Sequence, residues 1–182
     1  MHLKMSEKPK IISSFLKSYN FIFIVSLQPK FIMRVVIQRV SRANVKVEQR
    51  ITGEIGLGLL ILAGFEESDA DEDFEWICGK IIQLRIFPDE NGVMNISVQD
   101  VNGDILVVSQ FTLHALTKKG NRPSYIKSSP PETAKIQYER FVEILQNKYL
   151  RKIQCGEFGA DMKVELINDG PVTILIDSKN KE

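Results

Sequence analysis

The chain has 182 residues, of which 43% are hydrophobic and 26% are charged. This composition is typical of a globular domain that buries its own core, and it excludes a disordered chain or a fibre. No uninterrupted run of about 18 apolar residues is present, so the sequence predicts no membrane-spanning helix and no membrane partner. The two cysteines lie far apart, which fits a cytoplasmic location and argues against a zinc site.

The net charge of +1 is unevenly distributed along the chain. Residues 1–32 hold five lysines and a single acid, Glu7, which leaves 19 basic and 22 acidic residues in the remainder. A slightly acidic body is not a general nucleic-acid surface, so we expect no DNA partner. Any contact with RNA must be local.

Residues 1–32 differ from the rest of the chain and carry an apolar run at 21–27 (FIFIVSL). Three interpretations stay open: an upstream start codon with Met33 as the true first residue, a genuine extension, or a targeting segment. We predict a single domain over 33–182, beginning with the strand-like stretch MRVVIQRV.

The predicted elements follow in chain order. Apolar or alternating patterns predict strands at 35–40 and 43–48 and a buried strand at 59–65. A helix over 69–85 is expected, with Ser68 as its N-cap, followed by a hairpin in which Asn102-Gly103 joins strands at 94–99 and 104–111.

A long basic loop at 117–131 precedes a second helix at 132–149. Strands at 162–166 and 172–176 flank a turn at 168–171. The sum is an α+β domain with mostly antiparallel sheets and two principal helices.

The usual hydrolase and nucleotide-binding motifs are absent from the sequence. Thr112 and His114 would share a face of a strand, but no third group is seen to orient a catalytic pair, so we expect a surface histidine. Neither Cys78 nor Cys155 is expected to do more than pack, and no metal or cofactor is expected.

Two stretches are not explained by structure alone. Ser109-Gln110-Phe111-Thr112-Leu113 ends a strongly apolar strand, and Asn168-Asp169-Gly170-Pro171-Val172-Thr173 places Gly-Pro at a strand junction. Together with RIFPDENGVMNISV, NRPSY and CGEFGADMKVEL, their order resembles the D-aminoacyl-tRNA deacylases of the bacterial and eukaryotic type. The resemblance covers residues 33–176, with Tyr125 where that family usually has Phe.

The resemblance implies a homodimeric hydrolase that cleaves the carboxylic ester of D-aminoacyl-tRNA and of mischarged glycyl-tRNA, as chiral proofreading in translation. It places Ser109, Gln110, Phe111 and Thr112 at the reaction centre. Backbone amides near Phe111 would hold the oxyanion with help from Gln110. Thr112 is either a nucleophile or, as we favour, a positioning residue.

The resemblance further implies that a cis Gly170-Pro171 pair enters the partner subunit's site and excludes L side chains, with Arg39 anchoring it or forming a surface salt bridge. Phe158 and Met162 would contact the terminal adenine, or else pack in the core. Three loop cations would meet the tRNA phosphates, or else form a solvated surface: Lys118, Lys119 and Arg122. The alternatives are a non-catalytic RNA-binding dimer on the same fold and a Thr112–His114 hydrolase of other small esters or amides.

Overall fold

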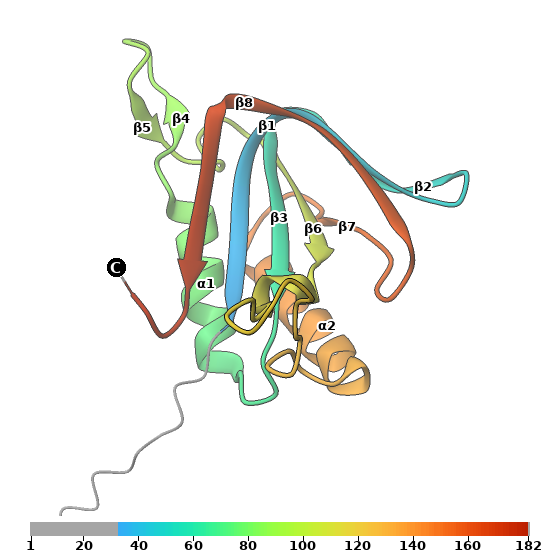
Figure 1. The fold of residues 1–182 in the computed structure, drawn as a ribbon. Coiled ribbons are helices and arrows are strands. Elements are labelled where there is room, and N and C mark those ends of the chain that lie inside the picture. Colours follow the sequence, from blue (N-terminus) through green and yellow to red (C-terminus); the bar gives the residue numbers. More distant parts are fainter. Residues whose placement is uncertain (1–32, 182) are drawn as a thin grey trace, which may run out of the picture.

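The computed structural model describes residues 33–181, so the predicted N-terminal extension lies outside the described residues. The fold is α+β, as predicted, and Figure 1 shows its arrangement. None of the helices in this part of the chain is long and apolar enough to cross a membrane. The elements are β1 (Arg34–Val47), β2 (Arg50–Ile55), β3 (Gly58–Gly64), α1 (Asp71–Gln83), β4 (Phe87–Pro88), β5 (Met94–Ile96), β6 (Asp104–Ser109), η1 (Phe111–His114), α2 (Pro131–Lys148), β7 (Gln154–Cys155) and β8 (Met162–Asp177).

The main sheet has the strand order β2-β1-β3-β6-β7, and β8 pairs with β1. Strand β1 is antiparallel to β2, β3 and β8, which fits the predicted mostly antiparallel sheet. The centre of the sheet differs, because β6 runs parallel to both β3 and β7. The predicted hairpin at Asn102-Gly103 is therefore wrong: β5 pairs with β4, although Asn102 keeps the positive φ of a turn residue.

Both helices cover one face of this sheet (Figure 1). The main core lies between the helices and that face of the sheet. Side chains of β3 alternate between this core, which takes Leu59 and Ile61, and a second cluster on the other face, which takes Leu60. Burial on both faces explains why β3 reads as a continuous apolar run. The second cluster also holds Val40, Ala43, Val45, Ile55, Leu106 and Val108.

Element boundaries depart from the prediction in several places, and β5 and β6 end at Ile96 and Ser109, short of the predicted 99 and 111. Helix α1 begins at Asp71 with Ala70 as its N-cap, where the Asp73 carboxylate accepts the Ala70 N–H at 3.3 Å. Strand β1 is continuous where two strands were predicted. Strand β8 continues through the predicted turn at 168–171, because the chain takes up the irregularity as shifts in its pairing with β1 rather than by leaving the sheet.

Candidate active site

A pocket of about 670 Å³ lies where β3 and β6 end side by side, with Ala63 opposite Ser109. Five of the predicted site residues line this pocket: Ser109, Gln110, Phe111, Phe158 and Met162. Ser109 ends β6 and is followed by Gln110 and Phe111, whereas Phe158 precedes β8 and Met162 begins it. The structure thus brings together two stretches separated by about fifty residues of sequence.

The chain turns sharply after Ser109. The Gln110 N–H donates to the carbonyl of Ala63 at 2.7 Å, and the 3₁₀ helix η1 begins at the next residue. The Gln110 amide donates to the Thr112 hydroxyl at 2.5 Å. No hydrogen bond joins Thr112 to His114 within residues 33–181, so the Thr–His couple required by the small-ester hydrolase alternative does not form.

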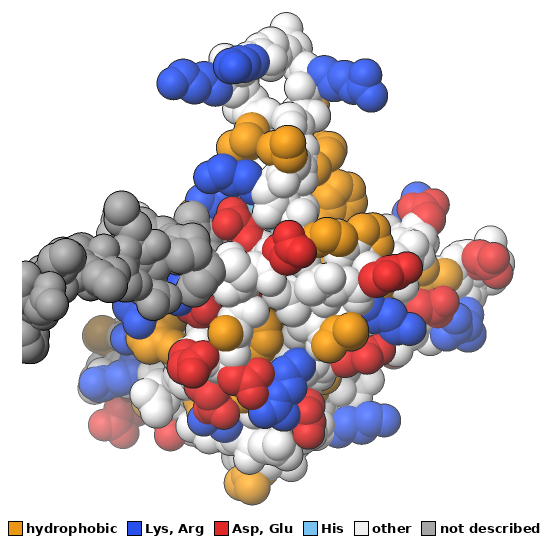
Figure 2. All heavy atoms as spheres, turned by 90° about the horizontal axis from the view of Figure 1, so that it is seen from below, with side chains coloured by type: hydrophobic (Ala, Val, Ile, Leu, Met, Phe, Trp, Pro, Cys, Tyr) orange, Lys and Arg blue, Asp and Glu red, His pale blue; other side chains and the backbone are white. Residues whose placement is uncertain are grey.

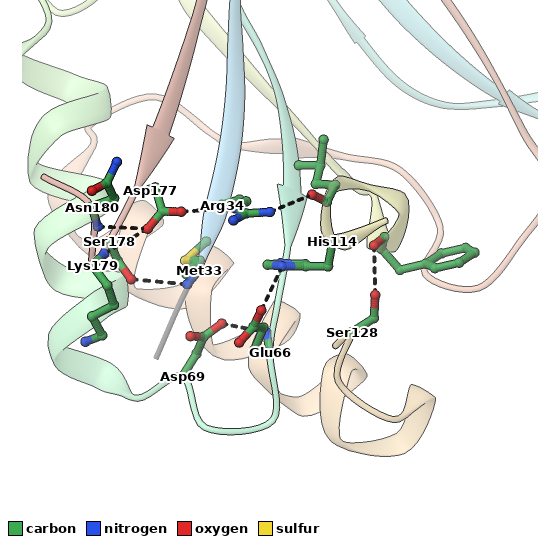
Figure 3. Close-up of polar contacts among 12 residues, drawn as sticks. Met33, Arg34, Glu66, Asp69, His114, Ser128, Asp177, Ser178, Lys179 and Asn180 are labelled. Carbon is green, nitrogen blue, oxygen red and sulfur yellow. Dashed lines mark hydrogen bonds and ion pairs between the residues drawn. The ribbon is translucent and has the colours of Figure 1, made fainter. Parts of the chain in front are cut away.

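His114 is not the surface histidine that the sequence predicts. Its side chain is 0% exposed at the end of η1, with Nδ1 3.3 Å from Oε1 of Glu66 (Figure 3). Burial lowers the pKa of His114. The prediction failed because it treated 112–114 as a strand end, whereas the 3₁₀ turn directs His114 inward.

Charged groups continue on both sides of this histidine (Figure 3). Arg34 donates from Nε to Asp177 at 3.0 Å and from Nη1 to the carbonyl of Leu113 at 3.2 Å. Asp69 accepts the Glu66 N–H at 2.7 Å. Burial raises the pKa of Asp69 to about 7, opposed by that backbone hydrogen bond.

The loop after η1 completes the rim of the pocket. The rings of Phe111 and Tyr125 meet edge to face at 4.9 Å, and the Ser128 hydroxyl donates to the Phe111 carbonyl at 2.9 Å. The buried hydroxyl of Ser129 has no hydrogen-bond partner within the described chain and also lines the pocket. Sequence reasoning missed both serines, because two adjacent serines before a Pro-Pro pair read as an ordinary helix entry.

The three predicted phosphate-contact residues, Lys118, Lys119 and Arg122, are exposed on this loop, and none forms an ion pair within residues 33–181. The loop is closed at its base by two hydrogen bonds between Leu116 and Ser124. Figure 2 looks at the molecule from below, and Lys and Arg side chains gather on the protrusion at the top of that view, above a band of hydrophobic side chains.

The Gly170–Pro171 bond is cis, and both residues are exposed in β8. They lie beside Arg39, which is 8% exposed, donates to the Asp169 carbonyl at 3.0 Å and is bonded to the Ile86 carbonyl. Arg39 is therefore a buried residue that contacts the backbone beside Gly170, and it also forms an ion pair with the Asp169 carboxylate at 3.2 Å.

Gly170 and Pro171 do not reach the pocket of their own chain. Arg39 pairs with Leu59 at the start of β3, whereas Ser109 pairs with Ala63 near its end. Four residues of strand separate the two positions, which is about 13 Å. Neither Gly170 nor Pro171 lines the pocket. Across residues 33–181, no cluster of three or more His, Cys, Asp or Glu side chains could hold a metal ion.

The sequence profile of the D-Tyr-tRNA(Tyr) deacylase family matches residues 36–177. The chain belongs to this family. Relatives named D-aminoacyl-tRNA deacylase include those of Flavobacterium johnsoniae and Bacteroides thetaiotaomicron, which are 64% and 60% identical over 150 residues. Each alignment covers 82% of this chain and 100% of the relative.

Two solved structures share the deacylase fold. One, named c-Myc DNA Unwinding Element Binding Protein, is 41% identical with a TM-score of 0.75, over 79% of this chain and 97% of that one. The other, a probable eukaryotic D-amino acid tRNA deacylase, has a TM-score of 0.66 over 80% of this chain and 99% of that one, and at 18% identity it supports the fold alone. As a deacylase of this family, the chain is a hydrolase that acts on ester bonds.

Proposed function

We propose that this deacylase releases D-amino acids and mischarged glycine from tRNA in the cytoplasm and spares L-aminoacyl-tRNA, as a chiral proofreader of translation. The observation that carries the proposal is the pocket at the end of β3 and β6, which Ser109, Gln110 and Phe111 line. An aminoacyl ester is already activated, so the site needs to hold the ester, place a water and stabilise the oxyanion.

The chemistry is assigned to the turn. The first amides of a 3₁₀ helix have no partner within the helix, so the backbone near Phe111 can donate to the oxyanion with help from Gln110. Ser109 lines the same wall of the pocket. Thr112 positions the substrate or water, since its hydroxyl is held by Gln110 and is hydrogen-bonded to no base within residues 33–181, and the 2′-hydroxyl of the substrate ribose assists.

Selectivity is assigned to Gly170 and Pro171 of a second copy of the chain. Their distance from their own pocket and their exposure support a homodimer in which each copy completes the other's site. Backbone carbonyls at Gly170-Pro171 would face the substrate amino group and leave no space for an L side chain. Glycine has no side chain, so a purely steric filter accepts it as well.

The tRNA end is assigned to the remaining residues. Phe158 and Met162 line the pocket, where an aromatic ring and a thioether can contact the unpaired terminal adenine. Lys118, Lys119 and Arg122 on the adjacent loop meet the phosphates of the acceptor arm.

The test is to follow hydrolysis of D-Tyr-tRNA, L-Tyr-tRNA and Gly-tRNA by the full chain in parallel. Rapid loss of the D and glycyl esters with the L ester intact is expected. Loss of the L ester at the same rate would remove the Gly170-Pro171 filter from the proposal. A folded dimer that binds tRNA and hydrolyses nothing would establish the alternative, a non-catalytic RNA-binding dimer, and a mass measurement in solution tests the dimer itself.

A further inference from the structure

The Ser109–Thr112 turn is held in place from several sides. The Gln110 N–H is bonded to β3, the Leu113 carbonyl to Arg34, and the Phe111 carbonyl to Ser128. Of the four residues of η1, the one with a buried side chain is His114. The histidine is therefore the internal anchor of the turn that the proposed reaction uses.

Gly64 lets both the imidazole and the Gln110 carbonyl lie against the same point of β3. A Cβ atom at Gly64 would lie 2.8 Å from the carbonyl oxygen of Gln110 and 3.2 Å from Nε2 of His114. The ring therefore packs against the same short piece of β3 backbone that the Gln110 carbonyl contacts. Any movement of the ring is transmitted to the turn, because interiors this closely packed have no space to absorb it.

An apolar side chain would anchor the turn at a lower free-energy cost. Burying an imidazole and a carboxylate costs free energy of hydration, which is recovered only where their attraction and hydrogen bonds offset it. The backbone of Glu66 is held in place, since its N–H donates to the Asp69 carboxylate. The approach of Nδ1 to Oε1 of Glu66 at 3.3 Å favours one orientation of the buried His114 ring, which an aliphatic side chain cannot provide.

His114 cannot act on the substrate directly. Its side chain has no exposed surface, and neither His114 nor Glu66 is among the residues that line the pocket. We propose that His114, oriented by Glu66, is a positioning residue that sets the Ser109–Thr112 turn for ester hydrolysis. This inference rests on the proposed function of that turn.

The test compares kcat and KM of the full chain for D-Tyr-tRNA in four variants. His114→Leu and Glu66→Ala should each lower kcat roughly 10- to 100-fold, with KM changed less than about threefold, because a misplaced turn weakens transition-state contacts more than binding. The double variant should lose no more than either single one, since the two residues act as a unit. His114→Asn, which keeps an amide nitrogen where Nδ1 stood, should recover most of kcat.

Tyr149→Phe is the control for general destabilisation, because it removes a buried hydroxyl bonded to the Gly103 carbonyl away from the pocket. It should lower the melting temperature and leave kcat intact. Any one of three results would overturn the inference. These are a wild-type kcat in Glu66→Ala, additive losses in the double variant, and equal kcat values in His114→Asn and His114→Leu. If His114→Leu fails to fold, Glu66→Ala and Glu66→Gln are compared instead. Glu66→Gln keeps an oxygen that can accept from Nδ1 and should therefore keep most of the activity.

Amide NMR spectra separate this inference from the proposed function. In the folded Glu66→Ala variant, the amide signals of residues 110–113 should shift and exchange faster, whatever the protein hydrolyses. An unaltered turn would overturn the inference alone, whereas an inactive wild type would overturn the proposed function alone.

Discussion

Arg39 and Asp169 are joined twice: the guanidinium Nε donates to the Asp169 carbonyl at 3.0 Å and lies 3.2 Å from its carboxylate Oδ2. The arginine comes from β1 and the aspartate immediately precedes Gly170 in β8. Because Arg39 is buried and also bonded to Ile86, the two contacts fix the position of the Gly170-Pro171 segment relative to the sheet.

Arg39→Lys should loosen that segment. Lysine cannot donate in two directions from a planar group, so the Asp169 or the Ile86 carbonyl loses its partner. We expect a destabilisation of about 1–3 kcal/mol and a D-to-L selectivity reduced by roughly tenfold or more. Parallel hydrolysis of D-Tyr-tRNA and L-Tyr-tRNA measures the ratio. Arg42→Lys, at an exposed position of the same strand, is the control, and an unchanged ratio in Arg39→Lys would remove the anchoring role.

Gly64→Ala should displace the reaction turn. The added methyl group would meet the Gln110 carbonyl at 2.8 Å, closer than a carbon and a backbone oxygen can lie. We expect a loss of about 1–3 kcal/mol in the free energy of unfolding together with a lower kcat. Gly79→Ala is the matched control, since its Cβ meets nothing within 4 Å in α1, and it should stabilise the fold by about 0.5–1 kcal/mol. Urea unfolding measures the free energy of unfolding of both variants, and an undiminished value in Gly64→Ala would contradict the prediction.

Thr112→Ala separates the two roles of the threonine. If Thr112 is a positioning residue held by Gln110, its loss should lower kcat about tenfold. If it is a nucleophile, its loss should lower kcat at least about 1,000-fold. Single-turnover hydrolysis of D-Tyr-tRNA measures the difference. We expect the smaller loss. A residual rate close to the uncatalysed one would show that Thr112 is the nucleophile.

Asp69 should make stability depend on pH. Its folded pKa of about 7 lies above the ordinary 3.8, mainly through burial and with repulsion from Asp73 and Glu66. The folded state therefore holds a proton that the unfolded chain releases, so this contribution is complete below pH 4 and is lost as pH rises towards 7. The full effect is about 4 kcal/mol at most.

Asp69→Asn should abolish that dependence while retaining an oxygen that accepts the Glu66 N–H. Thermal unfolding from pH 4 to 8 should show a flatter curve for the variant, with its largest gain over wild type above pH 7. Parallel curves for the two proteins would contradict the assignment of the proton to Asp69.

The loop cations should control affinity rather than chemistry. Replacing Lys118, Lys119 and Arg122 by Ala should raise KM for aminoacyl-tRNA, leave kcat unchanged and reduce the slope of log KM against log salt by up to about 2. Arg140→Gln, which removes an exposed cation paired with Asp71 on another surface, should not alter the slope. An unaltered slope in the triple variant would show that the three loop cations are solvated and do not contact the tRNA phosphates.

Much of this protein could be predicted from local patterns. The apolar run at 59–65 and the helical spacing at 132–149 gave elements correct to within one residue, because buried β3 and amphipathic α2 carry strong periodic signals. The order of the SQFTL and NDGPVT stretches predicted the family that the comparisons then established. The pairing of β6 with β3 and β7 could not be predicted. An Asn-Gly pair indicates a turn but does not indicate which strand the following residues pair with.

The sequence by itself predicted the family and the residues to which the chemistry is assigned in the proposal, because these predictions depend on residue type and order. Only the tertiary structure decided that His114 is buried opposite Glu66 and that Gly170 lies at the far end of β3 from Ser109. Both depend on features that local sequence patterns do not specify: β3 lies between β1 and β6 and pairs with each along its length, and the 3₁₀ turn at 111–114 points the His114 side chain inward. Spacing along the chain contains neither fact.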